Sequence, residues 1–427
     1  MMENIEEIFK EVDNIDSEKI MDLMRTVINI NTTLPPGKNY REFVDAVKPY
    51  FENLGYATEE VVVPEELIRD DPLGLEGPRI NLIATKDFGQ HNDISFYAHM
   101  DVVPAPKDGN KKWRFDPFEA TMTKGGKIFG RGTSDMKGTI VCIILALEII
   151  EKLKLTPKYD IRVMLCTDEE GGQYQGVRYL EENGYVKGSV FCMETVIMPI
   201  QIIGFAGSLN VIVKTHGRSA HSGANWMGVN ALEEMVPILD ELMELKHKVE
   251  VRESKNIPGG PPKPGSSEKP NLTPMFNLDI IQSGTKANIV PDLCTLTINR
   301  RYIPDEKIED VKQEIQEAID RGKAKSKAIE VTAEYISGVP PVEIDPDSPT
   351  SQRLKNVMSY VQNRPLEKIF QVGVSGGTDM GFVTNHEIIF HGLGNAGSNM
   401  HGVNESVKLK DVKTYIKELI VFLCADF

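Results

Sequence analysis

The sequence predicts an α/β protein, a largely parallel sheet covered by helices, with a smaller α+β unit inserted in it. Up to about residue 203, short apolar runs alternate with helical patterns, which is typical of a parallel sheet with helices on both faces. Between about 205 and 339 the strands alternate apolar and polar residues, as antiparallel strands do. After residue 340 the strand-and-helix alternation resumes, so we expect the second unit to be an insertion.

The first unit is defined by three strands and two helices. We expect strands over 94–101, 160–167 and 188–193, a buried helix over 138–154 and a short helix over 175–185. Strands and helices alternate in this order, as in βαβ units. The predicted domain comprises 1–204 and 340–427.

The inserted unit, 205–339, has four predicted strands and two amphipathic helices. The strands cover 207–217, 276–284, 292–304 and 328–336, and the helices cover 230–249 and 305–322. The run 256–274 is rich in proline and glycine, which predicts a loop. Such a small sheet with helices on one face forms a self-contained α+β unit.

Composition excludes several classes of protein. The 427 residues carry a formal charge of -15, with a pI near 5.2, which argues against sequence-independent binding of nucleic acid. No apolar run reaches the roughly 18 residues of a membrane span, and the acidic, amphipathic N-terminus is unlike a secretory signal. The cysteines form no CxxC pair, which predicts reduced thiols in a cytoplasmic protein; they are Cys142, Cys166, Cys192, Cys294 and Cys424.

Residues of the kind that bind metals follow several predicted strands or stand in loops bordered by glycine. They are His99, Asp101, Asp135, Asp168, Glu169, Glu170, Glu194 and His401. The carboxyl ends of strands in an open α/β sheet converge on the crevice where ligands bind. Carboxylates gathered there would repel one another unless a positive charge joined them. The pattern therefore predicts a divalent metal site.

The residue types narrow the choice of metal. Imidazoles and carboxylates without a thiolate suit zinc, cobalt or manganese better than calcium or magnesium. Two histidines and three or four carboxylates exceed what one tetrahedral zinc ion uses. Two metal ions about 3.5–4 Å apart, bridged by one carboxylate, would use them all.

Five motifs resemble those of a known family in order and spacing. They are "HMDVVP", "GRGTSDMKG", "TDEEGG", "METV" and "MHGVNE", and they resemble the co-catalytic zinc family of acetylornithine deacetylases, succinyl-diaminopimelate desuccinylases, aminoacylases and glutamate-releasing carboxypeptidases. The resemblance covers essentially the whole chain. It implies a zinc-peptidase-like catalytic domain, a ferredoxin-like inserted lid or dimerisation domain, and a homodimer formed through that domain.

The resemblance also implies a role for each residue of the metal site. Asp135 would bridge the two ions, with His99 and Glu194 on one ion and Glu170 and His401 on the other. Asp101 would accept the second ring N–H of His99 and fix its orientation. Glu169 would be the general base that passes a proton from water to the leaving amine.

Further residues would hold the substrate if the resemblance extends to the inserted unit. His221, in "HGRSAHSG", would reach the oxyanion. Asn288, Arg301 and the turn at Gly376, Gly377 and Thr378 would bind the substrate, the turn holding its carboxylate. Arg301 fits the family spacing better than Arg300, but Asn299 stands where the family often has Asp, so the choice of arginine stays open.

These residues have ordinary alternatives. Asp135 could cap the helix that follows it, the acidic turn 168–170 could be exposed, and His401 could lie in solvent. His391, which also follows an apolar run, is a reserve ligand.

The function expected is hydrolysis of the amide bond of an N-acyl amino acid in amino-acid metabolism. The alternatives are a dipeptidase, aminopeptidase or carboxypeptidase with the same metal pair, acting on short peptides, and a non-catalytic metal-binding homologue. No nucleic acid or membrane is expected as a partner.

Overall fold

The computed structural model describes residues 2–69, 73–105, 112–171, 175–260, 270–395 and 397–426. The chain divides into two compact units: unit 1 is Met1–Ile203, Ile344–Gln371 and Phe382–Phe427, and unit 2 is Gly204–Glu343 and Val372–Gly381. Residues 372–381, assigned to the first domain from the sequence, thus belong to unit 2. Their main chain is bonded there, since the Ala206 N–H donates to the carbonyls of Val374 and Gly376. Part of the predicted loop 256–274, residues 261–269, lies outside the described residues.

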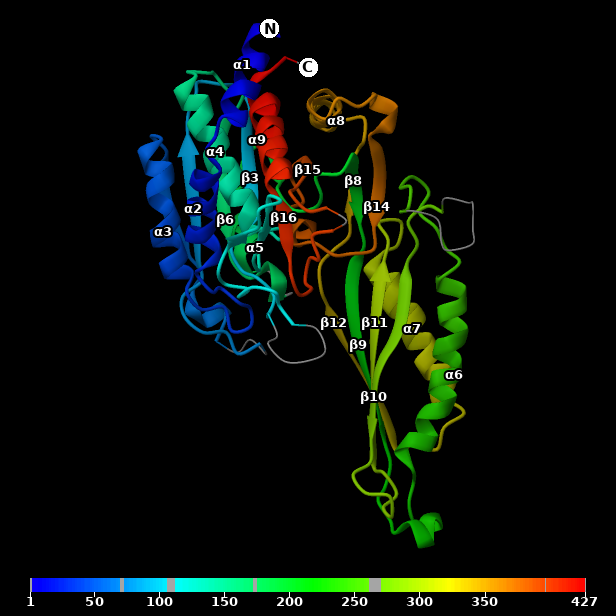
Figure 1. Cartoon of the computed structure of the whole chain (residues 1–427). Coiled ribbons are helices and arrows are strands. Elements are labelled where there is room, and N and C mark those ends of the chain that lie inside the picture. Colours follow the sequence, from blue (N-terminus) through cyan, green and yellow to red (C-terminus); the bar gives the residue numbers. More distant parts are fainter. Residues whose placement is uncertain are drawn as a thin grey trace. The chain divides into compact units, whose positions relative to one another are not determined.

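Unit 1 is built on a mixed sheet whose centre is parallel, which confirms the predicted fold class (Figure 1). The three strands predicted for the first unit form this centre, as β3, β6 and β7, and β3 runs parallel to the other two. The strand β15 is parallel to β7. The outer pairs β1–β2, β2–β6 and β15–β8 are antiparallel. In spatial order the strands are β1 (Ala57–Val62), β2 (Ile80–Lys86), β6 (Asp160–Cys166), β3 (Asp93–His99), β7 (Ser189–Cys192), β15 (Ile388–Phe390) and β8 (Ile200–Phe205). Two short strands, β13 (Val342–Glu343) and β14 (Phe370–Val374), also pair with β8.

Helices cover this sheet. The helix α4 (Lys137–Lys152) is buried along almost its whole length and packs against β3, α2 and α9, which explains why it is apolar on nearly every side. The other helices are α1 (Met2–Asp13), α2 (Ser17–Ile28), α3 (Tyr40–Asn53), α5 (Gln175–Glu182), α8 (Pro349–Val361) and α9 (Leu409–Cys424). Every helix in the described part of the chain is too short or too polar to cross a bilayer.

A small antiparallel sheet joins distant segments of unit 1. In it β5 (Lys127–Phe129) lies between β4 (Thr121–Met122) and β16 (Ser406–Lys408). The register pairs Ser406 with Phe129, so the segment before α9 lies beside the loop that leads into α4. Two predicted ligands, Asp135 and His401, belong to these two segments.

Unit 2 contains the predicted insertion and has the order β-α-β-β-α-β. Its antiparallel sheet has the spatial order β10 (Met275–Ser283), β11 (Leu293–Tyr302), β9 (Gly207–His216) and β12 (Glu330–Ser337). The helices α6 (Ala231–Val249) and α7 (Ile308–Lys323) lie side by side on one face (Figure 1). This is the ferredoxin-like arrangement, and alternate residues of β9 and β11 supply its core.

Candidate metal centre

The candidate site of unit 1 lies at the carboxyl ends of its central parallel strands. His99 is the last residue of β3 and stands in register with Cys166, the last residue of β6. A 3₁₀ turn, Glu169–Gly171, follows β6. Because parallel strands end at the same edge of a sheet, the histidine and the acidic turn lie next to each other.

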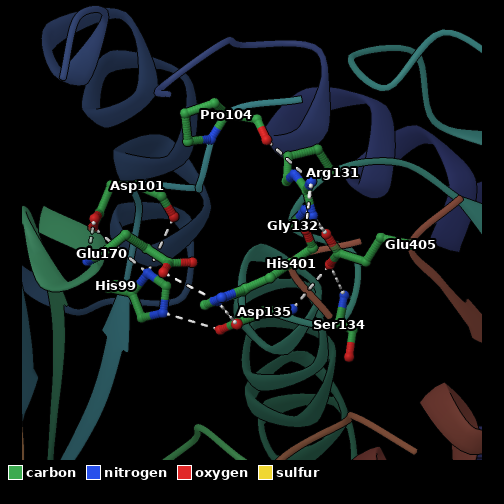
Figure 2. A network of polar contacts seen from close by, with 10 residues as sticks. All are labelled: His99, Asp101, Pro104, Arg131, Gly132, Ser134, Asp135, Glu170, His401 and Glu405. Carbon is green, nitrogen blue, oxygen red and sulfur yellow. Dashed lines mark hydrogen bonds and ion pairs between the residues drawn. The ribbon is translucent and has the colours of Figure 1, made fainter. Parts of the chain in front are cut away.

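Four predicted ligands converge there (Figure 2). His99 Nε2 lies 3.2 Å from Asp135 Oδ1. His401 Nε2 lies 3.0 Å from Asp135 Oδ2 and 3.1 Å from Glu170 Oε2. The structure therefore brings together residues from four segments that are far apart in the sequence.

Asp135 presents one carboxylate oxygen to each histidine. This is the geometry that a bridging carboxylate needs, with one oxygen for each of two ions. The alternative role of Asp135 as a helix cap does not apply, because the N-cap of α4 is Met136, which makes no side-chain cap hydrogen bond. The acidic turn is not exposed either, since the side chain of Glu170 is 4% exposed.

The neighbouring carboxylates raise the pKa of both imidazoles. Hydrogen bonds to Asp135 and Glu170 raise the pKa of His401 to about 10. Burial opposes a charge on His99, but the carboxylates of Asp101 and Asp135 outweigh it and raise the pKa of His99 well above its usual value. Burial, and then repulsion by Asp135, raise the pKa of Glu170. These shifts show that positive charge stabilises the cluster of carboxylates, as predicted from the sequence.

The donor set fits divalent metal ions. Atoms of His99, Asp135 and Glu170 that could bind a metal all lie within 4.8 Å of one another. Glu170 Oε1 is buried and has no hydrogen-bond partner among the described residues, and a buried carboxylate oxygen of this kind calls for a cation or a donor. Nitrogen and oxygen ligands without sulfur suit zinc, cobalt or manganese.

Asp101 orients the site in a way that differs in detail from the prediction. The ring Nδ1 of His99 donates to the main-chain oxygen of Asp101 over 3.1 Å, and the carboxylate oxygen Oδ1 is 3.5 Å away. The other carboxylate oxygen accepts the N–H of Glu170 over 2.8 Å. Asp101 therefore ties one predicted ligand to the turn that carries another.

Two more predicted residues, Glu169 and Glu194, follow the strands β6 and β7. Glu169 is half-buried, and its charge contributes to the raised pKa of His99. Glu194 is half-buried just beyond β7, and the N–H of Met193 before it donates to Tyr97 on β3. The roles of Glu169 as base and Glu194 as ligand remain predictions. The reserve ligand His391 is instead buried against Glu418, with 2.8 Å between Nε2 and Oε2.

The acidic turn is anchored by Arg79 and Tyr40, which the sequence did not single out. Asp168 is buried, and its backbone has a positive φ of 65°. One carboxylate oxygen accepts from Arg79 Nε over 3.0 Å, and the other from the Tyr40 hydroxyl over 2.9 Å. Burial raises the pKa of Asp168 to about 6 despite the guanidinium beside it. This buried pair fixes the residue before Glu169 and Glu170.

Glu405 and Arg131 form a second buried pair. Arg131 belongs to the motif "GRGTSDMKG" and Glu405 to "MHGVNE", but the sequence predicted no role for either. Arg131 Nη1 donates to Glu405 Oε2 over 2.7 Å, and both side chains are buried. Burial raises the pKa of Glu405 to about 7, although Arg131 opposes this. The only sequence signals of this pair are that Arg131 stands between two glycines and that Glu405 comes just before a strand.

In unit 2 the predicted His221 and Asn288 are neighbours. The N–H of Ser222 donates to the main-chain oxygen of Asn288 over 3.0 Å. His221 is exposed, and its Nδ1 accepts the N–H of Gly223 over 3.0 Å. A neutral ring with Nδ1 as acceptor carries its proton on Nε2, so His221 can donate a hydrogen bond to an oxyanion.

The structure favours Arg301 over Arg300 as the residue that can bind a substrate. Arg300 is fully buried and donates to Glu306 over 2.6 Å. Arg301 is half-buried and donates only weakly, over 3.3 Å, to Asn299. Asn299, which stands where the family often has Asp, thus accepts a hydrogen bond from Arg301 on the same strand.

Arg301 also lies against the predicted turn at 376–378. A Cβ on Gly377 would lie 3.2 Å from Arg301 Nη1 and 2.6 Å from Val339 Cγ2. Glycine is therefore required at 377 for this close approach. The neighbours of Gly377 differ in their surroundings. A Cβ on Gly376 would meet nothing within 4 Å, whereas Thr378 is buried.

Imidazoles and carboxylates clustered at the strand ends of a mixed α/β sheet are a metal centre of the kind that metal-dependent hydrolases use. The chain belongs to peptidase family M20/M25/M40, whose profile matches residues 95–423. It is accordingly a metal-dependent hydrolase that acts on amide bonds, as predicted.

Two relatives match 80% or more of the chain. The chain is 25% identical over 432 residues to N-formyl-4-amino-5-aminomethyl-2-methylpyrimidine deformylase of Bacillus subtilis, covering 95% of this chain and 94% of the relative. It is 28% identical over 353 residues to a probable succinyl-diaminopimelate desuccinylase of Staphylococcus epidermidis, covering 80% and 82%. The solved structure of the dipeptidase Dug1p of Saccharomyces cerevisiae shares the fold, with a TM-score of 0.74, 16% identity and coverage of 99% and 98%.

Proposed function

We propose that this protein hydrolyses the amide bond of N-acyl amino acids, using two divalent ions held by His99, Asp135, Glu170, Glu194 and His401. Zinc is the first choice of metal, with cobalt and manganese as alternatives. The bound ions would polarise the scissile carbonyl and make water acidic enough to attack near neutral pH.

Side chains of the protein would transfer the proton and stabilise the oxyanion. Glu169 takes a proton from the attacking water as the C–O bond forms, and returns it to the nitrogen as the C–N bond breaks. His221 donates from Nε2 to the developing oxyanion. The products are a carboxylic acid and a free amine.

The observation that carries the choice of substrate is the contact of Arg301 with the turn at Gly377. A guanidinium beside main-chain N–H groups is suited to a carboxylate, which every amino acid product retains. Two curated relatives, the deformylase and the probable desuccinylase, are named for removing an acyl group. The arginine and the turn support an amino acid as the product. Both relatives support removal of an acyl group, although the deformylase is named for a formylated pyrimidine and only the desuccinylase for an acylated amino acid.

The second candidate is a dipeptidase, aminopeptidase or carboxypeptidase. The fold it shares with the dipeptidase Dug1p supports it, because the C-terminal carboxylate of a peptide would suit the same arginine. A free peptide amine would favour an acidic partner in the pocket.

A substrate screen separates these functions. Metal-free protein is reloaded with zinc, cobalt or manganese and assayed with N-formyl, N-acetyl and N-succinyl amino acids and with dipeptides. The proposal expects turnover of the acylated amino acids, and their amides without the carboxylate serve as a control that should react poorly. Turnover of dipeptides alone would establish the second candidate instead.

We also propose that unit 2 forms a homodimer, since β10 and β12 are the outer strands of its sheet and outer strands can pair with another copy. Light scattering of the purified protein tests this.

A further inference from the structure

Glu405 gathers four hydrogen-bond donors from one short segment (Figure 2). Its Oε1 accepts the N–H groups of Ser134 over 2.8 Å and Asp135 over 3.1 Å. Its Oε2 accepts the N–H of Gly132 over 3.0 Å and Arg131 Nη1 over 2.7 Å. Residues 130–136 form turns and bends, so Glu405 supplies partners for main-chain groups that no helix or strand satisfies.

The same residue also holds the second loop of the site. The main-chain oxygen of Glu405 accepts the N–H of Gly130 over 3.1 Å, and His401 lies four residues before it. One residue therefore connects the loop of the proposed bridging carboxylate with the loop of a proposed imidazole ligand.

Arg131 extends this connection to a third segment. Its Nη2 donates to the main-chain oxygens of Pro104 over 3.2 Å and His401 over 3.4 Å. Pro104 follows the strand that delivers His99, and the guanidinium lies 5.2 Å from the ring centre of Trp113. The planar fork of arginine suits such contacts in several directions, which an ammonium group cannot make at once.

We propose that Glu405 is a positioning residue that sets the separation of Asp135 and His401, and that Arg131 links this pair to the segment after His99. This inference rests on the metal-binding part of the proposed function. Glu405 is not one of the proposed ligands, and all four of its side-chain partners are protein groups. Replacing such a partner behind a metal ligand typically costs 10–100-fold in metal affinity or activity.

Glu405→Gln tests the proposal with almost no change in shape. The amide keeps one oxygen for two of the N–H groups, but turns an NH₂ group toward the two remaining donors. Glu418→Gln is a matched control, because Glu418 is also a buried carboxylate, bonded to His391 and Gln362 over 2.8 and 2.9 Å, and lies outside the metal site.

Binding of Co²⁺ to the metal-free proteins is measured by competition with a chelating indicator, together with the visible spectrum of the bound ion. We expect Glu405→Gln to bind Co²⁺ about 10–100-fold more weakly, with an altered spectrum, and Glu418→Gln to match the wild type in both. Wild-type affinity and spectrum in Glu405→Gln would overturn the proposal. Equal weakening in Glu418→Gln would also overturn it, by showing a general effect of a lost buried carboxylate.

Arg131→Lys keeps the positive charge beside Glu405 and serves if Glu405→Gln does not fold. It should weaken Co²⁺ binding in the same direction, and unchanged binding would contradict the linking role. A wild type that takes up two Co²⁺ ions but hydrolyses no acylated amino acid would refute the proposed substrate class alone.

Discussion

Replacing Arg79 with methionine should strongly destabilise unit 1, because it leaves the carboxylate of Asp168 buried without a counter-charge. Arg79 and Asp168 have side chains that are 0% and 1% exposed, so water cannot replace the lost partner. Arg79 also donates to three main-chain oxygens over 2.8–2.9 Å, those of Pro36, Glu76 and Gly77. Removing one partner of a buried ion pair typically costs about 3–5 kcal/mol, and we expect a loss of this size.

The assay is urea unfolding of the metal-free protein followed by tryptophan fluorescence. The chain has two tryptophans, Trp113 in unit 1 and Trp226 in unit 2, so a Trp226→Phe background makes the signal specific to unit 1. Arg25→Met is the matched control, because Arg25 pairs with Glu18 and Asp22 on the surface, where its side chain is 42% exposed. The control should change the free energy of unfolding by less than about 1 kcal/mol.

Asp168→Asn in the Arg79→Met background should recover part of the loss. It removes the unpaired charge, and asparagine tolerates the positive φ of this position. The reasoning is refuted if Arg79→Met costs no more than Arg25→Met, or if the second substitution adds to the loss.

Three further predictions concern the site. Glu169→Gln should lower kcat by at least about 100-fold while metal content stays near the wild-type value, and an active variant would remove Glu169 as base. His401→Ala should lower the metal content measured by elemental analysis, because Asp135 and Glu170 lose the imidazole that both contact; full occupancy would show that His401 is not a ligand. Gly377→Ala should raise KM for substrates with a carboxylate, since its Cβ would crowd Val339 and Arg301, and an unchanged KM would exclude the turn from the substrate site.

The strands β3, β6 and β7 and the helices α4, α6 and α7 could be predicted from apolar periodicity. The strand predicted over 94–101 is β3, and the helix predicted over 138–154 is α4, because both are buried and carry long apolar runs. No element was predicted before residue 94, where α1–α3, β1 and β2 lie. There β1 is mostly exposed or half-buried, so its sequence lacks the apolar run that marks a central strand.

The cluster of His99, Asp135, Glu170 and His401 could be predicted because its members follow strands or motifs that are visible locally. The buried pairs around it could not. Arg131 and Glu405 are 274 positions apart, and Arg79 and Asp168 are 89 apart. Local patterns mark a charged residue but do not show which distant residue neutralises it, and each such pair is stabilised only by the folded arrangement.

The discontinuity of unit 1 has a consequence during synthesis on the ribosome. The helix α4 packs against α9, and β5 pairs with β16, yet α9 and β16 are made only after the whole of the inserted region 204–343. Until the segment that carries them emerges, the nascent polypeptide carries an apolar helix without its cover, together with an incomplete set of ligands. The full set of proposed ligands therefore comes together only after His401 has been made, and until then the unfinished chain depends on protection from aggregation.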